Sequence, residues 1–146
     1  MDEALLEARA AAAHEDVPIG AVVVHEGRVI GRGHNRREVD RDPTAHAEIL
    51  ALREAAATLG RWHLDDCAMY VTVEPCPMCA GAAILARLAL VVFGAPDEKA
   101  GAVRSVAELL DEPRLNHHPR WRLGVRRAEA EAVLSEFFLS RRRTDD

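Results

Sequence analysis

Cysteine is scarce in this sequence: it occurs three times in 146 residues, too rarely for the disulfide framework of a small secreted domain. Two of the three stand in a C-x-x-C pattern, which in a reducing compartment more often binds a metal or performs redox chemistry. We therefore expect a cytoplasmic protein whose paired cysteines serve chemistry.

The sequence also lacks a secretory leader and a membrane span. Its start, MDEALLEARAAAAHEDVP, is acidic where a signal peptide is basic. The longest apolar run, AGAAILARLALVVFGA, is interrupted by Arg87 and falls short of the roughly 20 residues that a spanning helix needs. These absences predict a soluble protein with no membrane partner.

An excess of positive charge is missing as well. The formal net charge of −5 argues against a broadly basic nucleic-acid-binding domain. Arginines nevertheless gather in three stretches, which form either a local basic surface or solvated faces: GRGHNRREVDR, NHHPRWR and SRRRTDD.

No repeat, low-complexity segment or linker rich in Gly, Ser or Pro divides the chain. With 49% hydrophobic residues, a chain of this length can bury one core, and we expect a single domain over residues 1–146.

Hydrophobic periodicity predicts an alternation of helices and strands. Helices are expected over residues 2–14, 44–59, 76–87 and 126–142, and strands within a hairpin at 19–35 and over 68–74 and 88–95. Such alternation implies parallel pairing through right-handed crossovers, hence an α/β fold with a mixed sheet and helices on its faces.

Two short stretches, PTAHAEILAL and EPCPMCAGA, each place residues of chemical interest at the start of a predicted helix. Asp42 or Thr44 is expected to cap the first of these helices with a side-chain oxygen. This arrangement would bring His46 and Glu48 into the first two turns of that helix.

In the second stretch Cys76 and Cys79 share one helix face, and the positive end of the helix dipole favours their thiolates. With His46 they make a ligand set that suits tetrahedral zinc and leaves the fourth position for water, as in catalytic sites. Glu48, which is not needed as a ligand, is the expected general acid–base.

Each half of this pattern has an ordinary alternative, because a lone histidine is usually a core residue and a lone C-x-x-C can be redox-active or structural. Together, H-x-E followed by P-C-x-x-C is the signature of zinc-dependent nucleobase deaminases.

From Val17 to Phe138 the sequence resembles the bacterial tRNA-specific adenosine deaminases, a family of the cytidine-deaminase-like superfamily. The matching blocks are VPIGAVVVH, GHNR, DPTAHAEILALR, YVTVEPCPMCAGA, VVFGAPDEKAGA, LNH and LSEFF. The resemblance implies a three-layer α/β/α fold with a central mixed sheet of about five strands. It also implies hydrolytic conversion of the wobble adenosine in a tRNA anticodon loop to inosine.

The resemblance carries over to individual residues. It implies one zinc ion per chain held by His46, Cys76 and Cys79, with Glu48 as the proton shuttle.

For the substrate, the resemblance implies that Asn35 hydrogen-bonds the target base and that Asp97 contacts the nucleotide backbone. The alternatives are a turn residue for Asn35 and a loop-capping aspartate for Asp97. It further implies a homodimer whose RNA site draws on both subunits, with Ala80–Leu85 in the interface or equally in the core.

Three departures from the family's pattern lie in the part that would meet RNA. They are Pro96, the run Val103-Arg104-Ser105, and His118-Pro119-Arg120-Trp121 in a stretch expected to be more strand-like. They bear on the substrate and leave the zinc chemistry untouched.

The remaining candidate residues have ordinary structural explanations. Cys67 is expected to be a buried thiol. Trp62 and Trp121 either stack on exposed bases or pack in the core or an interface.

Three functions fit these residues. The flanking blocks favour an RNA-acting adenosine deaminase. The second candidate is a deaminase of free guanine, cytosine or a nucleoside with the same zinc chemistry. The third is a non-catalytic, zinc-stabilised interaction module, against which the presence of Glu48 argues.

Overall fold

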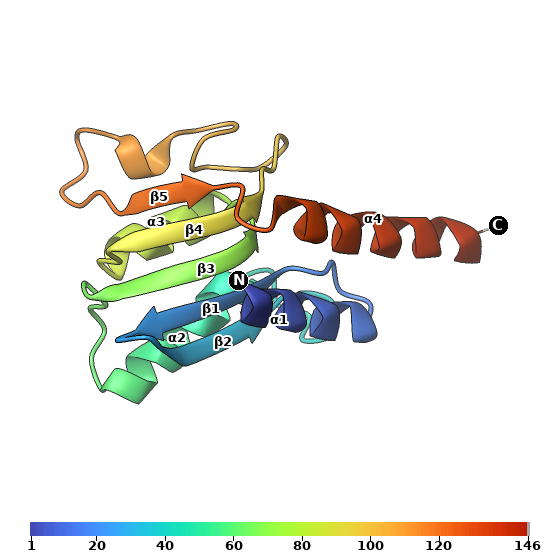
Figure 1. The fold of residues 1–146 in the computed structure, drawn as a ribbon, viewed down its shortest axis with the longest axis horizontal. Helices are drawn as coiled ribbons and strands as arrows, with labels where there is room; N and C mark the ends of the chain where they lie inside the picture. The colour runs from blue at the N-terminus through green and yellow to red at the C-terminus, as the bar shows by residue number, and fades with distance from the viewer. Residues whose placement is uncertain (146) are drawn as a thin grey trace.

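A computed structural model describes residues 1–145; Asp146, the last residue of the predicted domain, lies outside the described residues. The elements follow one another as α1 (Asp2–Ala13), β1 (Gly20–His25), β2 (Arg28–His34), α2 (Ala47–Leu59), β3 (Cys67–Val73), α3 (Pro77–Leu85), β4 (Leu90–Ala95), the 3-10 turn η1 (Leu109–Asp111), β5 (Arg120–Leu123) and α4 (Arg127–Thr144). Figure 1 shows this arrangement, which confirms the predicted α/β fold.

The five strands form one mixed sheet in the order β2-β1-β3-β4-β5. β1 runs antiparallel to both β2 and β3, whereas β3, β4 and β5 are parallel. The β1–β2 hairpin turns at Glu26 and Gly27, both with positive φ, as its two-residue connection requires. The parallel strands β3 and β4 are joined through α3, the crossover that parallel pairing demands.

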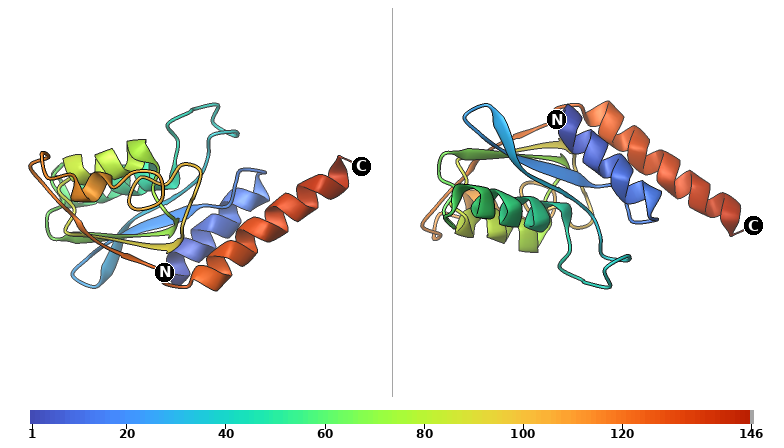
Figure 2. Two further views of the ribbon diagram at one scale, coloured as in Figure 1. Left: turned by 90° about the horizontal axis from the view of Figure 1, so that it is seen from above. Right: turned by 90° about the horizontal axis from the view of Figure 1, so that it is seen from below.

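The helices cover the sheet in two layers, with α2 and α3 on one face and α1 and α4 on the other (Figure 2). The larger apolar core lies beneath α2 and α3 and includes Met69, Val91 and Phe93. A smaller cluster packs under α1 and α4. The C-terminal half of α4 extends beyond the sheet (Figure 1).

Two glycines of β2 let α2 lie close against the sheet. A Cβ atom at Gly31 would stand 2.2 Å from the carbonyl oxygen of Ala51, and one at Gly33 2.3 Å from that of Ala47. Because Ala47 is the first residue of α2, the contact at Gly33 fixes the position of the helix start.

The expected cap of α2 is wrong. The Oδ1 atom of Asp42 accepts hydrogen bonds from the backbone N–H and the hydroxyl of Thr44, both at 2.8 Å, so this pair closes its own turn. The helix begins three residues later than predicted, and His46 occupies the N-cap position without a side-chain cap. Gly60 ends the helix in the left-handed conformation, as expected.

Other expectations are resolved by burial. Cys67 is buried, and this burial raises the pKa of its thiol to about 11. Trp121 stacks on Phe93 at the edge of the larger core, whereas Trp62 is 66% exposed. β5 begins at Arg120, within the stretch His118-Pro119-Arg120-Trp121 that departs from the family's pattern. Among the described residues, no helix combines the length and hydrophobicity needed to cross a bilayer.

Candidate metal centre and active site

The candidate site forms where the N-termini of α2 and α3 meet. His46 is the N-cap residue of α2 and Cys76 that of α3, both in extended conformation, and Pro77 opens α3 at a position where no backbone N–H is needed. Both helix dipoles therefore present their positive ends to the same place, which favours anionic side chains there.

Three donor atoms converge at this point. His46 Nδ1 lies 3.6 Å from the sulfur of Cys76 and 3.6 Å from that of Cys79, and all three atoms lie within 4.8 Å of one another. Tetrahedral zinc with ordinary Zn–N and Zn–S distances would separate nitrogen from sulfur by about 3.5 Å. The donor set could thus hold a metal ion without rearrangement.

The thiols of Cys76 and Cys79 differ in how readily each loses its proton. Hydrogen bonds with Cys79 and then with His46 lower the pKa of Cys76 to about 4. The interaction with Cys76 raises the pKa of Cys79, which keeps the proton. A metal ion bound by both sulfurs would replace that proton.

Glu48 lies beside the donors in the first turn of α2 and is 4% exposed. Burial raises the pKa of its carboxyl group to about 7. It does not belong to the three-residue donor group, which consists of His46, Cys76 and Cys79. Its position is that of a carboxylate next to, but outside, a ligand set.

His46, Glu48 and Cys76 line a cavity of about 270 Å³. This volume lies just below the roughly 300–1,000 Å³ typical of sites for drug-sized ligands, which suits a group the size of a nucleobase. The cavity is lined by Val17, Ile19, Asn35, Arg37, His46, Ala47, Glu48, Val73, Glu74, Cys76, Asp97 and Ala100.

Asn35 is buried on the wall of this cavity. Its Nδ2 atom donates to the carbonyl oxygen of Val17 at 3.2 Å, and its Oδ1 atom accepts from the N–H of Arg37 at 3.1 Å. An amide nitrogen carries two hydrogens, so one donor remains for a ligand. Asn35 is thus both a turn residue and a lining residue.

Asp97 combines the two interpretations considered for it. Its Oδ1 atom accepts from the N–H groups of Lys99, at 3.0 Å, and Ala100, at 3.2 Å, and so caps its own loop. Asp97 nevertheless lines the cavity.

Sequence reasoning missed two charged residues of the cavity, Arg37 and Glu74. Glu74 directly precedes the C-x-x-C motif and is 3% exposed. Burial alone would raise its pKa, but hydrogen bonds from the Ser105 hydroxyl and from backbone N–H groups hold the pKa below the ordinary value. The sequence signal that could have identified Glu74 is its position, since it is a carboxylate between a predicted buried strand and a metal-binding motif.

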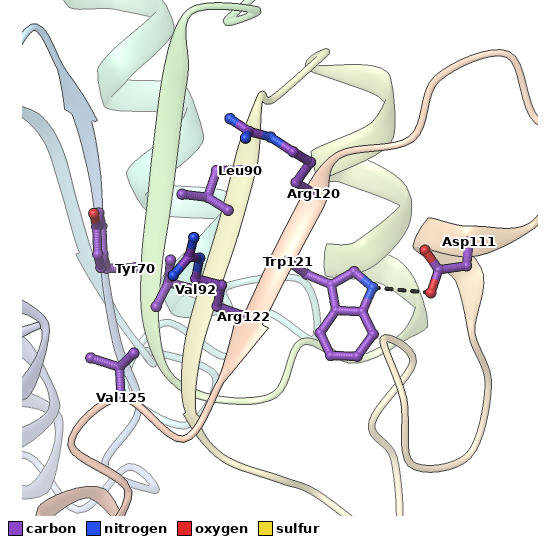
Figure 3. A pocket seen from close by; sticks show the side chains of 8 residues that line it. All are labelled: Tyr70, Leu90, Val92, Asp111, Arg120, Trp121, Arg122 and Val125. Atoms are coloured by element: carbon purple, nitrogen blue, oxygen red, sulfur yellow. Dashed lines mark hydrogen bonds between the residues drawn. The ribbon is translucent and has the colours of Figure 1, made fainter.

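The largest cavity, about 670 Å³, lies elsewhere. Tyr70, Val92 and Arg122 stand side by side in the register of β3, β4 and β5, on the face opposite Met69, Val91 and Trp121 of the larger core. Figure 3 shows Arg120 and Arg122 beside an apolar floor. None of the predicted site residues lines this cavity.

Comparison with known proteins agrees with the chemistry of the smaller cavity. A family model described as MafB19-like deaminase matches residues 1–142. The tRNA-specific adenosine deaminase of Bacillus subtilis is 48% identical over 138 residues, which cover 94% of this chain and 86% of that protein.

Two solved structures extend this result. One, from studies of A-to-I editing by tRNA:A34 deaminases at the wobble position, matches with a TM-score of 0.89 at 44% identity and covers 92% of this chain and 97% of that one. The guanine deaminase of Nitrosomonas europaea matches with a TM-score of 0.80 at 28% identity, covering 93% and 81%.

Proposed function

This chain belongs to the MafB19-like deaminases and, among them, to the tRNA-specific adenosine deaminases, and we propose that it hydrolyses the wobble adenosine of a tRNA anticodon loop to inosine. One observation carries the proposal. Over nearly its whole length the chain matches a relative of that name at 48% identity, and it brings a His-Cys-Cys donor set and a buried glutamate into one cavity.

We assign His46, Cys76 and Cys79 to one zinc ion per chain, because an imidazole and two thiolates with this spacing suit zinc. When bound, zinc supplies Lewis-acid activation of a water molecule at neutral pH. Glu48 would take one proton from the water and pass it to the purine ring nitrogen N1 while the water oxygen bonds to C6. The remaining hydroxyl proton would then pass to the amino group, so that the C6–N bond breaks and ammonia leaves.

Asn35 and Asp97 would orient the substrate. The free amide hydrogen of Asn35 matches an acceptor nitrogen of the base. The second carboxylate oxygen of Asp97 would accept from a hydroxyl of the nucleotide backbone. A loop base can be splayed into such a cavity at modest cost, whereas a base paired in a stem cannot.

A side-by-side assay tests the proposal. The purified protein would be given an anticodon stem-loop with adenosine at the wobble position, free adenosine, free guanine and free cytosine, with ammonia release measured for each. We expect the stem-loop to be turned over fastest. Faster turnover of guanine would reject the RNA substrate and favour the activity of the guanine deaminases, whose fold this chain shares.

We also propose that the protein is a homodimer, in which a second copy of the chain covers an exposed apolar groove between α2 and α3. Of the run Ala80–Leu85, Ala80 and Ala83 lie in the core, but Leu85 is 75% exposed and lines the groove with Trp62. Leu85→Glu should shift the protein towards monomer in sedimentation analysis, whereas Leu6→Glu, at an exposed apolar residue of α1, should not. A monomeric wild-type protein would reject this assignment. We also propose a cytoplasmic location, where a tRNA substrate would be met.

A further inference from the structure

The segment after β4 forms one side of the candidate cavity. Asp97 and Ala100, both in this segment, line the cavity together with Asn35 and Arg37. The segment has no regular secondary structure before η1, so hydrogen bonds to the rest of the protein must fix its path.

One carboxylate receives most of these bonds. Glu74 stands directly after β3, and its Oε1 atom accepts from the N–H of Asp97 at 3.1 Å and from the hydroxyl of Ser105. Its Oε2 atom accepts from the N–H groups of Val103 (3.2 Å), Arg104 (2.8 Å) and Ser105 (2.9 Å). Both ends of the segment, residues 97 and 103–105, therefore meet on one side chain.

These bonds use the full capacity of the carboxylate. Two carboxylate oxygens offer about four acceptor sites in total, and five donors already point at them. Glu74 is also outside the group of donors that converge with His46. It is thus neither placed as a metal ligand nor free to exchange protons with a substrate.

The segment closes tightly around this carboxylate. A Cβ atom at Gly101 would lie 2.3 Å from Cδ and 2.4 Å from Oε2 of Glu74. Only glycine leaves room for the backbone to pass at this distance. The neighbouring residue Ala102 donates its N–H to the carbonyl oxygen of Pro75 at 2.8 Å, which adds a backbone contact beside the side-chain ones.

We propose that Glu74 is a positioning residue for substrate binding: its carboxylate fixes residues 97–105 to the end of β3 and thereby holds Asp97 and Ala100 at the cavity. The identity of the substrate rests on the proposed function, whereas the contact between Glu74 and the segment does not. Glu74 acts through Asp97, because it accepts from that residue's backbone N–H while Asp97 lines the cavity.

Glu74→Gln tests this role. The variant keeps the size of the side chain but replaces one oxygen by an NH₂ group, so a donor would face the N–H groups of residue 97 or of residues 103–105. Amide hydrogen exchange should become faster at those residues, with metal content unchanged. On the substrate that the wild-type protein turns over, KM should rise by about 10-fold or more while kcat changes by less than about 3-fold.

Glu112→Gln is the control, because Glu112 lies shortly after residues 97–105 in the chain, pairs with Arg114 and takes no part in the hydrogen bonds around Glu74. It should leave exchange and kinetics as in the wild type. Ser105→Ala removes a single donor and should raise KM less than Glu74→Gln does. In the Glu74→Gln background it should add nothing further, since its acceptor is already lost.

If Glu74→Gln fails to fold, Gly101→Ala reaches the same contact from the other side and should give the same exchange and KM pattern. Unchanged exchange at residues 97 and 103–105, or unchanged KM despite faster exchange, would overturn the proposal. Loss of metal from Glu74→Gln would also overturn it, because Glu74 would then act through the metal site. If the wild-type protein deaminates a free base but not the stem-loop, the proposed function is wrong while the role of Glu74 is still testable. The KM of the variants is then measured on that base.

Discussion

The floor and the rim of the candidate cavity are built in different ways. The floor consists of three residues at two helix starts, His46, Glu48 and Cys76, and Cys79 completes the donor set. The rim consists of residues on two irregular segments: Asn35, Arg37, Asp97 and Ala100. The floor is placed by helix geometry, whereas the rim is placed by hydrogen bonds to two buried carboxylates.

Those carboxylates belong to Asp16 and Glu74, both almost fully buried. Asp16 accepts from the N–H groups of Glu38, at 2.8 Å, and Val39, at 3.2 Å, and so holds the segment that follows Asn35 and Arg37. Glu74 holds the segment that carries Asp97 and Ala100. The comparison teaches that the donor set is encoded in two short motifs, each at a helix start, while the shape of the cavity depends on hydrogen bonds from backbone groups that belong to no motif.

The largest effect is expected from breaking the floor at its donor set. Cys79→Ser replaces the buried sulfur of a proposed metal ligand with a much weaker donor, so metal content should fall far below one ion per chain and deamination should be lost. Cys67→Ser is the matched control, because Cys67 is equally buried but remote from the donor set. Elemental analysis and ammonia release measure both variants. Full metal and activity in Cys79→Ser would show that the donor assignment is wrong.

Removing the proposed proton shuttle should have the next largest effect. Glu48→Ala should keep the metal and the fold but lower kcat by about 10²–10⁴-fold, the usual cost of losing a general acid–base. Glu54→Ala, at an exposed glutamate of the same helix, should behave as wild type. If Glu48→Ala instead releases its metal on dialysis, Glu48 is a ligand.

The difference between floor and rim also explains what the sequence could predict. The order of elements, the hairpin turn at Glu26-Gly27 and the convergence of His46 with the two cysteines follow from local patterns. The proposed role of Glu74 does not, because its partners, 23 to 31 residues away, are mainly backbone N–H groups, which no residue pattern marks.

The errors have the same origin. The cap of α2 was expected at Asp42 or Thr44 because both are good capping residues, but the two bind each other instead. In α4, the spacing of the apolar residues favours a stripe that includes Phe137 and Phe138, yet Phe138 is 46% exposed while Phe137 is buried. In both cases spatial neighbours decided the outcome.

A smaller effect should follow when the helix that carries the floor is displaced. Gly33→Ala would place a Cβ atom 2.3 Å from the carbonyl oxygen of Ala47, so the start of α2 must shift. We expect a loss of about 1–3 kcal/mol in the free energy of unfolding, accompanied by weaker metal retention. Gly81→Ala, where nothing lies within 4 Å of the added atom, should instead stabilise α3 by up to about 1 kcal/mol. Denaturant titrations measure the free energy of unfolding of both variants. Equal values for Gly33→Ala and Gly81→Ala would refute the close contact at Gly33.

The smallest effect is expected from charges outside both floor and rim. Arg141, Arg142 and Arg143 are exposed in the last turn of α4, which projects beyond the sheet (Figure 1). Changing all three to glutamine should weaken stem-loop binding several-fold at low salt and leave metal content unchanged. If they contact phosphates, the slope of log K against log salt should become shallower by up to about 2 units, because fewer counterions are released. The control is Arg9→Gln with Arg28→Gln, two exposed arginines outside the three arginine-rich stretches, in α1 and at the start of β2. These should leave the slope unchanged. An equal change of slope in both variants would mean that net charge, rather than the position of the tail, governs binding.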